Sequence, residues 1–281
     1  MSLPLLLGAL CLSLATGLPR EHRPDVSNLI YGGVAEQEPF APFMVFHDAS
    51  SGQFCGGSLL NQNHVLTAAH CVHNRTISAI TIYAGLSHMG DTNLEHPLVQ
   101  VSAIKSVTIH PKFHRPLLIH DIAIVTLETP FQYTSKIQPI KINVNDWATE
   151  IRGQTVSLFG FGLTEWPAKW NRNKLLNRAD VAVVDREDCR KSWEASDVHL
   201  EVNFEKICTW GQGKGVLQGD SGSPVIFFQL DLLTNRLEAR QVGVISGGDA
   251  KRQNVPDVHV RASSYCGWIT EITKWSFVCS L

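Results

Sequence analysis

The chain has 281 residues, of which 44% are hydrophobic, enough for one large domain or two smaller ones with substantial cores. Its formal net charge of −2 argues against a nucleic-acid-binding protein or a polybasic membrane protein, because both carry clustered Lys and Arg. The 12 histidines show no HExxH or comparable ligand spacing, so we expect no catalytic metal and no cofactor.

The N-terminal segment MSLPLLLGALCLSLATG predicts a secretory signal peptide over residues 1–17. Its apolar stretch, 3–14, is short for a membrane-spanning helix, and Ala15 and Gly17 fit a signal-peptidase site. A signal anchor is the alternative, and the lack of a positive charge before the apolar run weakens the signal-peptide interpretation. No later segment has 18 consecutive apolar residues, so we expect a secreted, extracellular protein that is free of the membrane once the signal is removed.

Short apolar runs rich in Val, Ile, Thr and Phe follow, separated by Gly, Pro, Asn and Asp. They lie at 43–48, 57–69, 79–85, 98–110, 122–127, 155–162, 179–185, 223–228 and 240–248. Many alternate with polar residues and few are long enough for a helix, a pattern typical of an all-β sandwich or barrel. In the last stretch, Trp268, Ile269, Ile272 and Trp275 recur at helical spacing, which predicts an amphipathic helix over about 266–277.

The stretch QGDSGSP (218–224) raises the question of whether Ser221 is a nucleophile. A serine hydroxyl reacts only if a neighbouring base takes its proton, and that base must be held in the right tautomer. His70, in LTAAHC after an apolar strand, is the candidate base. Asp121, in HDIAIVTL, opens a strongly apolar strand and is the candidate carboxylate. Each of the three could also be an ordinary core, capping or turn residue.

The order His, Asp, Ser in these contexts, together with IYGG (30–33) and FCGGSLL (54–60), resembles the chymotrypsin-like serine proteases of the trypsin/chymotrypsin superfamily. The resemblance runs from Ile30 to about Trp275. It implies an all-β peptidase domain over 30–281 made of two packed antiparallel β-barrels, with the active site between them. By this resemblance the first barrel covers about 30–135, a connector about 136–150 and the second barrel about 151–265, before the C-terminal helix.

The resemblance also implies a role for each candidate residue. Ser221 attacks the scissile carbonyl, His70 transfers the proton and Asp121 orients His70. The backbone N–H groups of Gly219 and Ser221 form the oxyanion hole.

Activation is implied as well, because in this family the new N-terminal amine pairs with the aspartate before the nucleophile. Ile30 and Asp220 match these positions, which makes 18–29 a propeptide and the chain a zymogen. Cleavage must fall after Leu29, so a chymotrypsin-like or elastase-like enzyme is expected to activate it, or the protein itself.

The substrate pocket, matched in the same way, contains Gly215 at its base and Ser246, Gly248 and Asp257 on its wall. This glycine and aspartate pattern resembles that of the crab collagenolytic serine proteases, which accept both basic and large apolar residues. Broad, apolar (chymotrypsin-like) and trypsin-like specificities all stay open, and collagenolysis does not follow from these residues alone.

Seven cysteines are present, and six remain once Cys11 leaves with the signal peptide. An even number in an oxidising compartment favours disulfides. The family resemblance pairs Cys55 with Cys71 and Cys189 with Cys208. Cys266 and Cys279 flank the predicted helix, whose rise of ~1.5 Å per residue would hold them too far apart to bond, so Cys266 is expected to be a buried thiol and Cys279 is left unassigned.

Asn74 opens an Asn-Arg-Thr sequon and is a candidate N-glycosylation site. No structural calcium is expected near 85–96, since Leu86 occupies the first ligand position of the calcium loop found in relatives. We therefore expect a monomeric secreted endopeptidase whose partners are protein or peptide substrates and protease inhibitors, with no nucleic acid. A catalytically silent homologue that acts as a binding module is the alternative. An esterase or lipase would need a GxSxG motif, and residues 219–223 read GDSGS.

Overall fold

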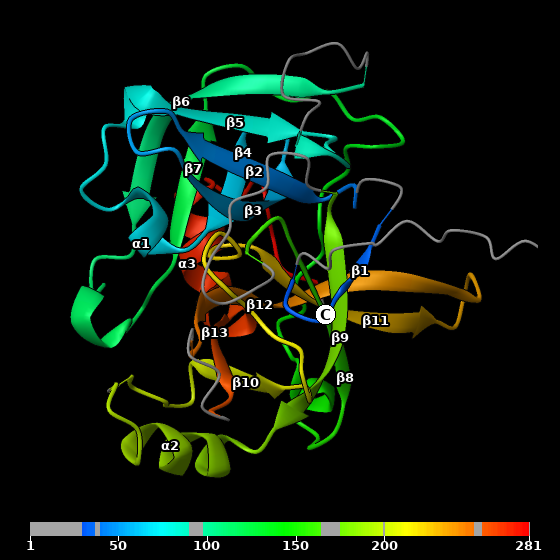
Figure 1. Cartoon of the computed structure of the whole chain (residues 1–281). Helices are drawn as coiled ribbons and strands as arrows, with labels where there is room; N and C mark the ends of the chain where they lie inside the picture. The colour runs from blue at the N-terminus through cyan, green and yellow to red at the C-terminus, as the bar shows by residue number, and fades with distance from the viewer. Residues whose placement is uncertain are drawn as a thin grey trace, which may run out of the picture.

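Two β-barrels lie side by side in the computed structural model, with short helices at their edges (Figure 1). The structure describes residues 30–36, 40–89, 98–163, 175–198, 200–249 and 255–280. The expected signal peptide, the propeptide and most of the expected calcium loop lie outside these ranges. Within the described ranges, no helix combines the length and apolar content that crossing a membrane requires.

The first barrel consists of six antiparallel strands in the order β2-β3-β4-β7-β6-β5, and it closes because β2 pairs with both β3 and β5. The strands are β2 (Phe43–Asp48), β3 (Gln53–Asn61), β4 (His64–Thr67), β5 (Ile80–Ala84), β6 (Gln100–Ile109) and β7 (Ala123–Leu127). Strand β5 shows the period of two that the sequence predicted: Ile80, Ile82 and Ala84 are buried, and the residues between them are partly exposed.

The second barrel has the strand order β9-β10-β13-β12-β11-β8 and closes through the pairing of β8 with β9. Its strands are β8 (Thr155–Gly160), β9 (Asn177–Val184), β10 (Lys206–Trp210), β11 (Pro224–Asp231), β12 (Arg236–Gly247) and β13 (Asp257–Arg261). The all-β expectation and the two barrels are thus confirmed.

The N-terminal end of the described chain belongs to the second barrel. The short strand β1 (Val34–Ala35) pairs with β9, and Ile30 is fully buried among the apolar side chains of the second barrel. The expected range of the first barrel, which began at Ile30, is therefore wrong at its start. Residues 30–35 precede the first barrel in sequence but pack on the second.

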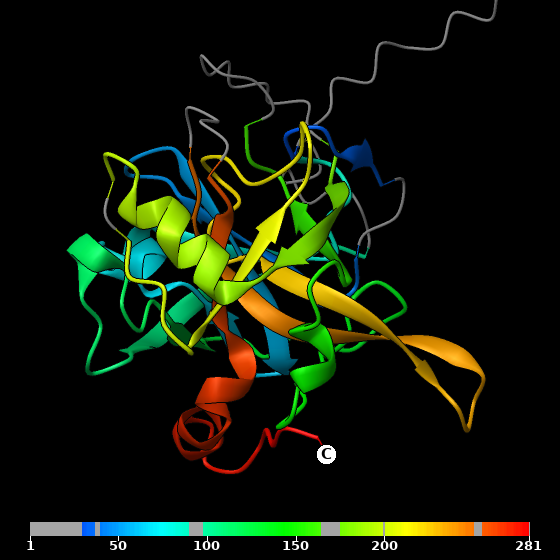
Figure 2. The same ribbon diagram turned by 90° about the horizontal axis from the view of Figure 1, so that it is seen from below.

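One hairpin of the second barrel, β11–β12, extends well away from the body of the molecule (Figures 1 and 2). One of its faces carries the cross-strand pair Leu230 and Leu237, and Leu233 at its tip is 97% exposed. The opposite face is polar and is tied to the connector by an ion pair between Lys141 and Glu238.

The described residues form three α-helices: α1 (Ala69–Val72), α2 (Arg186–Glu194) and α3 (Cys266–Ile272). Figure 2 shows α2 and α3 at separate positions on the outside of the barrels. Helix α2 was not predicted from the sequence. Its signal is a local one: the Asp185 carboxylate caps it by accepting the N–H groups of Glu187 and Asp188 at 2.9 and 3.1 Å. Single-turn 3₁₀ segments lie at Ile77–Ala79, Arg115–Leu117, Trp147–Thr149 and Ala262–Tyr265.

The C-terminal helix corrects two expectations. It ends at Ile272 rather than near 277, because Lys274 and Trp275 adopt left-handed backbone angles through which an α-helix cannot continue. The chain then turns back, so that Cys266 and Cys279 lie 5.8 Å apart between Cα atoms and form a disulfide. The expected buried thiol is therefore wrong. The pairs Cys55–Cys71 and Cys189–Cys208 form as expected.

Candidate active site

A fully buried carboxylate, that of Asp121, connects the two barrels at the candidate site. Its Oδ1 accepts the backbone N–H of His70 at 2.8 Å, and its Oδ2 lies 2.7 Å from His70 Nδ1. Oδ2 also accepts the hydroxyl of Ser246, from strand β12 of the second barrel, at 2.6 Å. Burial alone raises the pKa of Asp121, but the His70 charge and these hydrogen bonds outweigh it and leave the pKa below its ordinary value.

Strand register explains why His70 and Asp121 meet although 51 residues separate them. Strands β4 and β7 are antiparallel neighbours, and Thr67 at the end of β4 lies opposite Ala123 at the start of β7. His70 follows in α1 just after β4 ends, and Asp121 stands just before β7 begins. Both side chains therefore leave the barrel at the same edge.

Ser221 lies in a turn held against the first barrel through its backbone. Its carbonyl accepts the N–H of Gly56 on β3 at 2.7 Å, and the adjacent Cys55 is bonded to Cys71, the neighbour of His70. Within the described part of the chain, the Ser221 hydroxyl makes no hydrogen bond, to His70 or to another residue. Such bonds are often long in substrate-free enzymes and tighten in the complex. The structure thus joins His70, Asp121 and Ser246 directly, and brings Ser221 to them through backbone contacts.

Two backbone N–H groups in this turn are available to a ligand. Gly219 has φ +101°, a backbone conformation that side chains disfavour. Among the residues that the structure describes, neither the Gly219 nor the Ser221 N–H donates to a protein acceptor. These are the two groups that the sequence assigned to an oxyanion hole.

Asp220, the residue before Ser221, is fully buried. Its carboxylate accepts the N–H of Gly162 at 2.8 Å and that of Leu217 at 2.9 Å. Ile30, the residue expected to pair with it after activation, is also fully buried.

Ser223, the residue that follows the GDSG motif, is fully buried against Gly56. A Cβ built on Gly56 would collide with the Ser223 hydroxyl. That hydroxyl has no hydrogen-bond partner among the described residues, so its burial costs free energy without compensation.

The expected pocket residues do come together. Gly215 donates its N–H to the Tyr31 carbonyl at 3.1 Å, and the next residue, Val216, donates its N–H to Asp257 Oδ2 at 3.0 Å. Asp257 is only 3% exposed, and a Cβ built on Gly248 would collide with its Oδ1. Ser246 does not share these contacts, because its hydroxyl donates to Asp121.

Sequence reasoning missed the apolar residues of this region. Val216 lies against Gly248, 2.8 Å from the position of a Cβ there. The Leu200 and Leu118 side chains lie 3.0 and 3.2 Å from the position of a Cβ on Gly247, so they fill the space beside this glycine. The only available signal for Val216 was its place between Gly215 and the GDSG motif.

Two further expectations concern the surroundings of His70. The sulfurs of Cys55 and Cys71 gather near its imidazole as in a metal site, but their disulfide removes the thiolates that a metal would bind. Asn74, two residues after the end of α1, is exposed, so its amide is open to modification.

Comparison with known proteins gives the following matches. The sequence profile of the trypsin family matches residues 30–269. The chain is 31% identical over 281 residues to the clotting factor G beta subunit of Tachypleus tridentatus, covering 94% of this chain and 87% of that protein. It is 29% identical to a venom serine protease of Polistes dominula, covering 82% and 79%. It is 28% identical to a chymotrypsin of Phaedon cochleariae, covering 83% and 78%.

The unpartnered Ser223 hydroxyl gives a stability prediction. Ser223→Ala should raise the free energy of unfolding by about 1 kcal/mol, because it removes a buried donor that bonds nothing. Ser58→Ala is the matched control: Ser58 is also fully buried, but its hydroxyl bonds Gln241 Oε1 at 2.6 Å, so this variant should lose about 1–2 kcal/mol. Denaturant unfolding measures both, and equal destabilisation by the two variants would contradict the prediction.

The buried His259 on β13 gives a pH prediction. Burial, and secondarily the charge of Lys206, lowers the pKa of His259 from 6.5 to about 3, and its Nε2 lies 2.8 Å from the Thr209 hydroxyl. Between these two pH values the unfolded chain binds a proton here and the folded chain does not. The stability associated with His259 is therefore fully present above pH 6.5, and it is lost as the pH is lowered from 6.5 to about 3.

Between pH 6 and 4, the free energy of unfolding of the unchanged protein should fall by about 1.4 kcal/mol more per pH unit than that of His259→Gln. The glutamine keeps a polar partner for Thr209. Unfolding curves at three pH values, in a Ser221→Ala background to prevent self-digestion, measure the slope. Parallel pH dependences would show that His259 does not titrate as stated.

Proposed function

Because the chain belongs to the trypsin family, we propose that it is a serine endopeptidase that hydrolyses peptide bonds through an acyl-enzyme on Ser221. The observation that carries this proposal is the geometry around Asp121. The Oδ1 of this buried carboxylate accepts the backbone N–H of His70, and its Oδ2 accepts both the Ser246 hydroxyl and the Nδ1–H of the imidazole. This arrangement provides what a general base requires, a fixed ring and a fixed tautomer.

The residues would act in sequence. With the His70 Nδ1 proton donated to Asp121, Nε2 is the nitrogen left to take the Ser221 proton as Oγ attacks the substrate carbonyl. The negative charge that develops on the carbonyl oxygen would be met by the N–H groups of Gly219 and Ser221. The imidazolium, stabilised by Asp121, then protonates the leaving amine. Water repeats these steps in reverse to release the acid.

The second candidate function is a silent homologue that binds proteins without cutting them, and the trypsin family includes such members. The absence of a Ser221–His70 hydrogen bond within the described residues is the one observation that favours it. The intact dyad of His70 and Asp121 favours the enzyme, since a binding module gains nothing from a buried charge placed against a histidine.

A serine-directed fluorophosphonate probe separates the two. Protein processed to begin at Ile30 should be labelled and should cleave peptides. Ser221→Ala should abolish labelling and lower the hydrolysis rate at least about a thousandfold, because the nucleophile is gone. Ser223→Ala is the matched control, since it removes a neighbouring hydroxyl that bonds nothing, and should stay active. Folded, correctly processed protein that resists the probe would establish the silent homologue instead.

We infer that the enzyme prefers large apolar residues before the cut and accepts basic ones more weakly. Support comes from Val216 beside Gly248, which adds an apolar surface, and from the buried Asp257, whose Oδ2 is engaged by the Val216 N–H. A carboxylate in this position attracts a cation, but its Oδ2 already accepts the Val216 N–H and is less available to the cation. Collagenolysis has no support from this geometry.

Asp257→Asn tests this specificity because asparagine can still accept the Val216 N–H through its carbonyl oxygen. Matched peptides ending in Phe, Leu and Arg should show higher kcat/KM for Phe and Leu than for Arg. The variant should lose about tenfold or more on the Arg peptide and keep Phe cleavage within about threefold, because only the cation loses its counter-charge. A faster Arg peptide in the unchanged enzyme would reverse the assignment.

We further propose secretion as a zymogen, glycosylated at Asn74 and activated by cleavage after Leu29. The apolar N-terminal segment, the exposed sequon and the buried positions of Ile30 and Asp220 support this. Mass spectrometry of protein from the medium of secretory cells tests all three parts. The precursor should begin at Leu18 and the probe-reactive form at Ile30, and the peptide that contains Asn74 should carry a glycan. A probe-reactive form that begins elsewhere would refute the activation site.

A further inference from the structure

The backbone just before Asp121 is held in an unfavourable conformation. Leu118 and His120 have φ of 50° and 47°, in the left-handed region that non-glycine residues rarely adopt. Both belong to the loop between β6 and β7, and His120 is bonded to Asp121 in the chain. Such a conformation persists only where surrounding contacts hold it.

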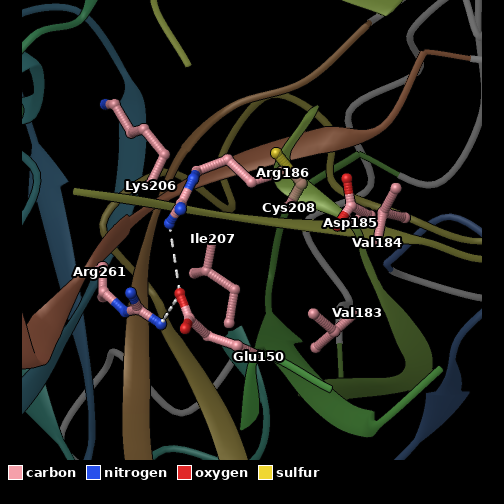
Figure 3. Close-up of a pocket in the computed structure, with 9 residues that line it drawn as sticks. All are labelled: Glu150, Val183, Val184, Asp185, Arg186, Lys206, Ile207, Cys208 and Arg261. Atoms are coloured by element: carbon pink, nitrogen blue, oxygen red, sulfur yellow. Dashed lines mark hydrogen bonds and ion pairs between the residues drawn. The ribbon is translucent and has the colours of Figure 1, made fainter. Parts of the chain in front are cut away.

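The contact at Leu118 comes from the second barrel. The Nζ of Lys206, the first residue of β10, donates to the Leu118 carbonyl at 2.5 Å. Lys206 is 3% exposed, and no carboxylate lies within 4 Å of its ammonium among the residues that the structure describes. Figure 3 shows that this ammonium points away from the ion pairs of Glu150 with Arg186 and Arg261, so it does not belong to that cluster.

The contact at His120 also comes from the second barrel. His120 Nδ1 lies 3.0 Å from Glu205 Oε2 and 2.9 Å from the Tyr265 hydroxyl. The His110 ring also packs against His120, with 4.6 Å between centroids, and against Tyr265. Glu205 and Lys206 are neighbours in sequence, so one short segment of the second barrel holds both left-handed residues.

We propose that Glu205 and Lys206 are positioning residues for the candidate active site, because they hold residues 118–120 in the conformation that presents Asp121 to His70. This inference rests on the proposed function. Neither residue touches the candidate nucleophile, and their effect passes through the Leu118 carbonyl and the His120 ring to the next residue, Asp121. They would make formation of the reactive geometry depend on docking of the two barrels.

The charge of Lys206 adds a second effect. Burial lowers the pKa of Lys206 to about 8, and the charges of Asp121, Glu205 and Glu201 oppose this lowering. Other titratable groups in this surrounding are His259, whose own pKa Lys206 lowers, and His120, which faces Glu205. Tyr265 and His110 pack against His120: burial and the charges of Glu205 and Asp121 raise the pKa of Tyr265, and burial together with His120 lowers the pKa of His110 to about 4. As pH rises through about 8, Lys206 loses the charge that attracts Asp121.

The experiment compares four forms of the processed enzyme: unchanged, Lys206→Met, Lys206→Arg and Glu205→Gln. Fluorophosphonate labelling rate, kcat and KM are measured from pH 6 to 10. Lys206→Met and Glu205→Gln should lower kcat and the labelling rate by about tenfold to a hundredfold with KM nearly unchanged, because a misplaced base slows the chemical step rather than binding. Lys141→Met, which removes an exposed lysine paired with Glu238, is the matched control and should change neither.

The pH profile distinguishes positioning from mere packing. The unchanged enzyme should lose activity near pH 8, whereas Lys206→Arg should stay active to pH 10, because arginine keeps its charge. The α-amino group of Ile30 is a competing cause of activity loss at alkaline pH. If Lys206→Arg still loses activity near pH 8, the loss belongs to this amine and the charge effect of Lys206 is overturned.

Unchanged labelling and kcat in Lys206→Met would overturn the proposal as a whole. If Lys206→Met does not fold, Lys206→Arg and Glu205→Gln decide the matter by the same criteria. Failure of the unchanged enzyme to react with the probe refutes the proposed function instead, which is a separate result.

Discussion

The candidate site depends on the hydrogen bonds around the buried Asp121 carboxylate. A charge without solvent is costly unless hydrogen bonds compensate it, and here the compensating groups come from both barrels. His70 belongs to the first barrel and Ser246 to the second. The two barrels therefore cannot separate without exposing an uncompensated charge, and the candidate site exists only in the assembled fold.

The turn that carries Ser221 repeats this dependence on both barrels. Its residues come from the second barrel, yet the Ser221 carbonyl is held by Gly56 and the Ser223 side chain packs on the same glycine. The Cys55–Cys71 disulfide then links this strand to α1, so that the nucleophile and the base share one rigid support.

Much of the site could be read from the sequence because its signals are local. A strand of alternating residues, a glycine-flanked serine and a lone aspartate before an apolar run are each visible within a few residues, although the serine and the aspartate became candidates for catalysis only in combination with His70. What failed depended on how the chain returns in space. Cys266 and Cys279 were judged too far apart on the assumption of a straight helix, whereas two left-handed residues after Ile272 bring the chain back. Val216 and Leu200 carry no signal of their own, since an apolar side chain can face a core or a pocket alike.

Strand periodicity by itself determined the element type, and motif chemistry singled out the three candidate catalytic residues, because both signals lie within a few residues of each other. The two-barrel architecture came only from the resemblance to a known family. The tertiary structure decided which groups lie together. Ile30 joins the second barrel, and Ser246 bonds Asp121. Lys206 bonds the Leu118 carbonyl and Glu205 contacts the His120 ring, just before Asp121. These contacts join residues that are distant in the chain. Their free energy depends on burial and distance, which exist only after the barrels have closed and docked.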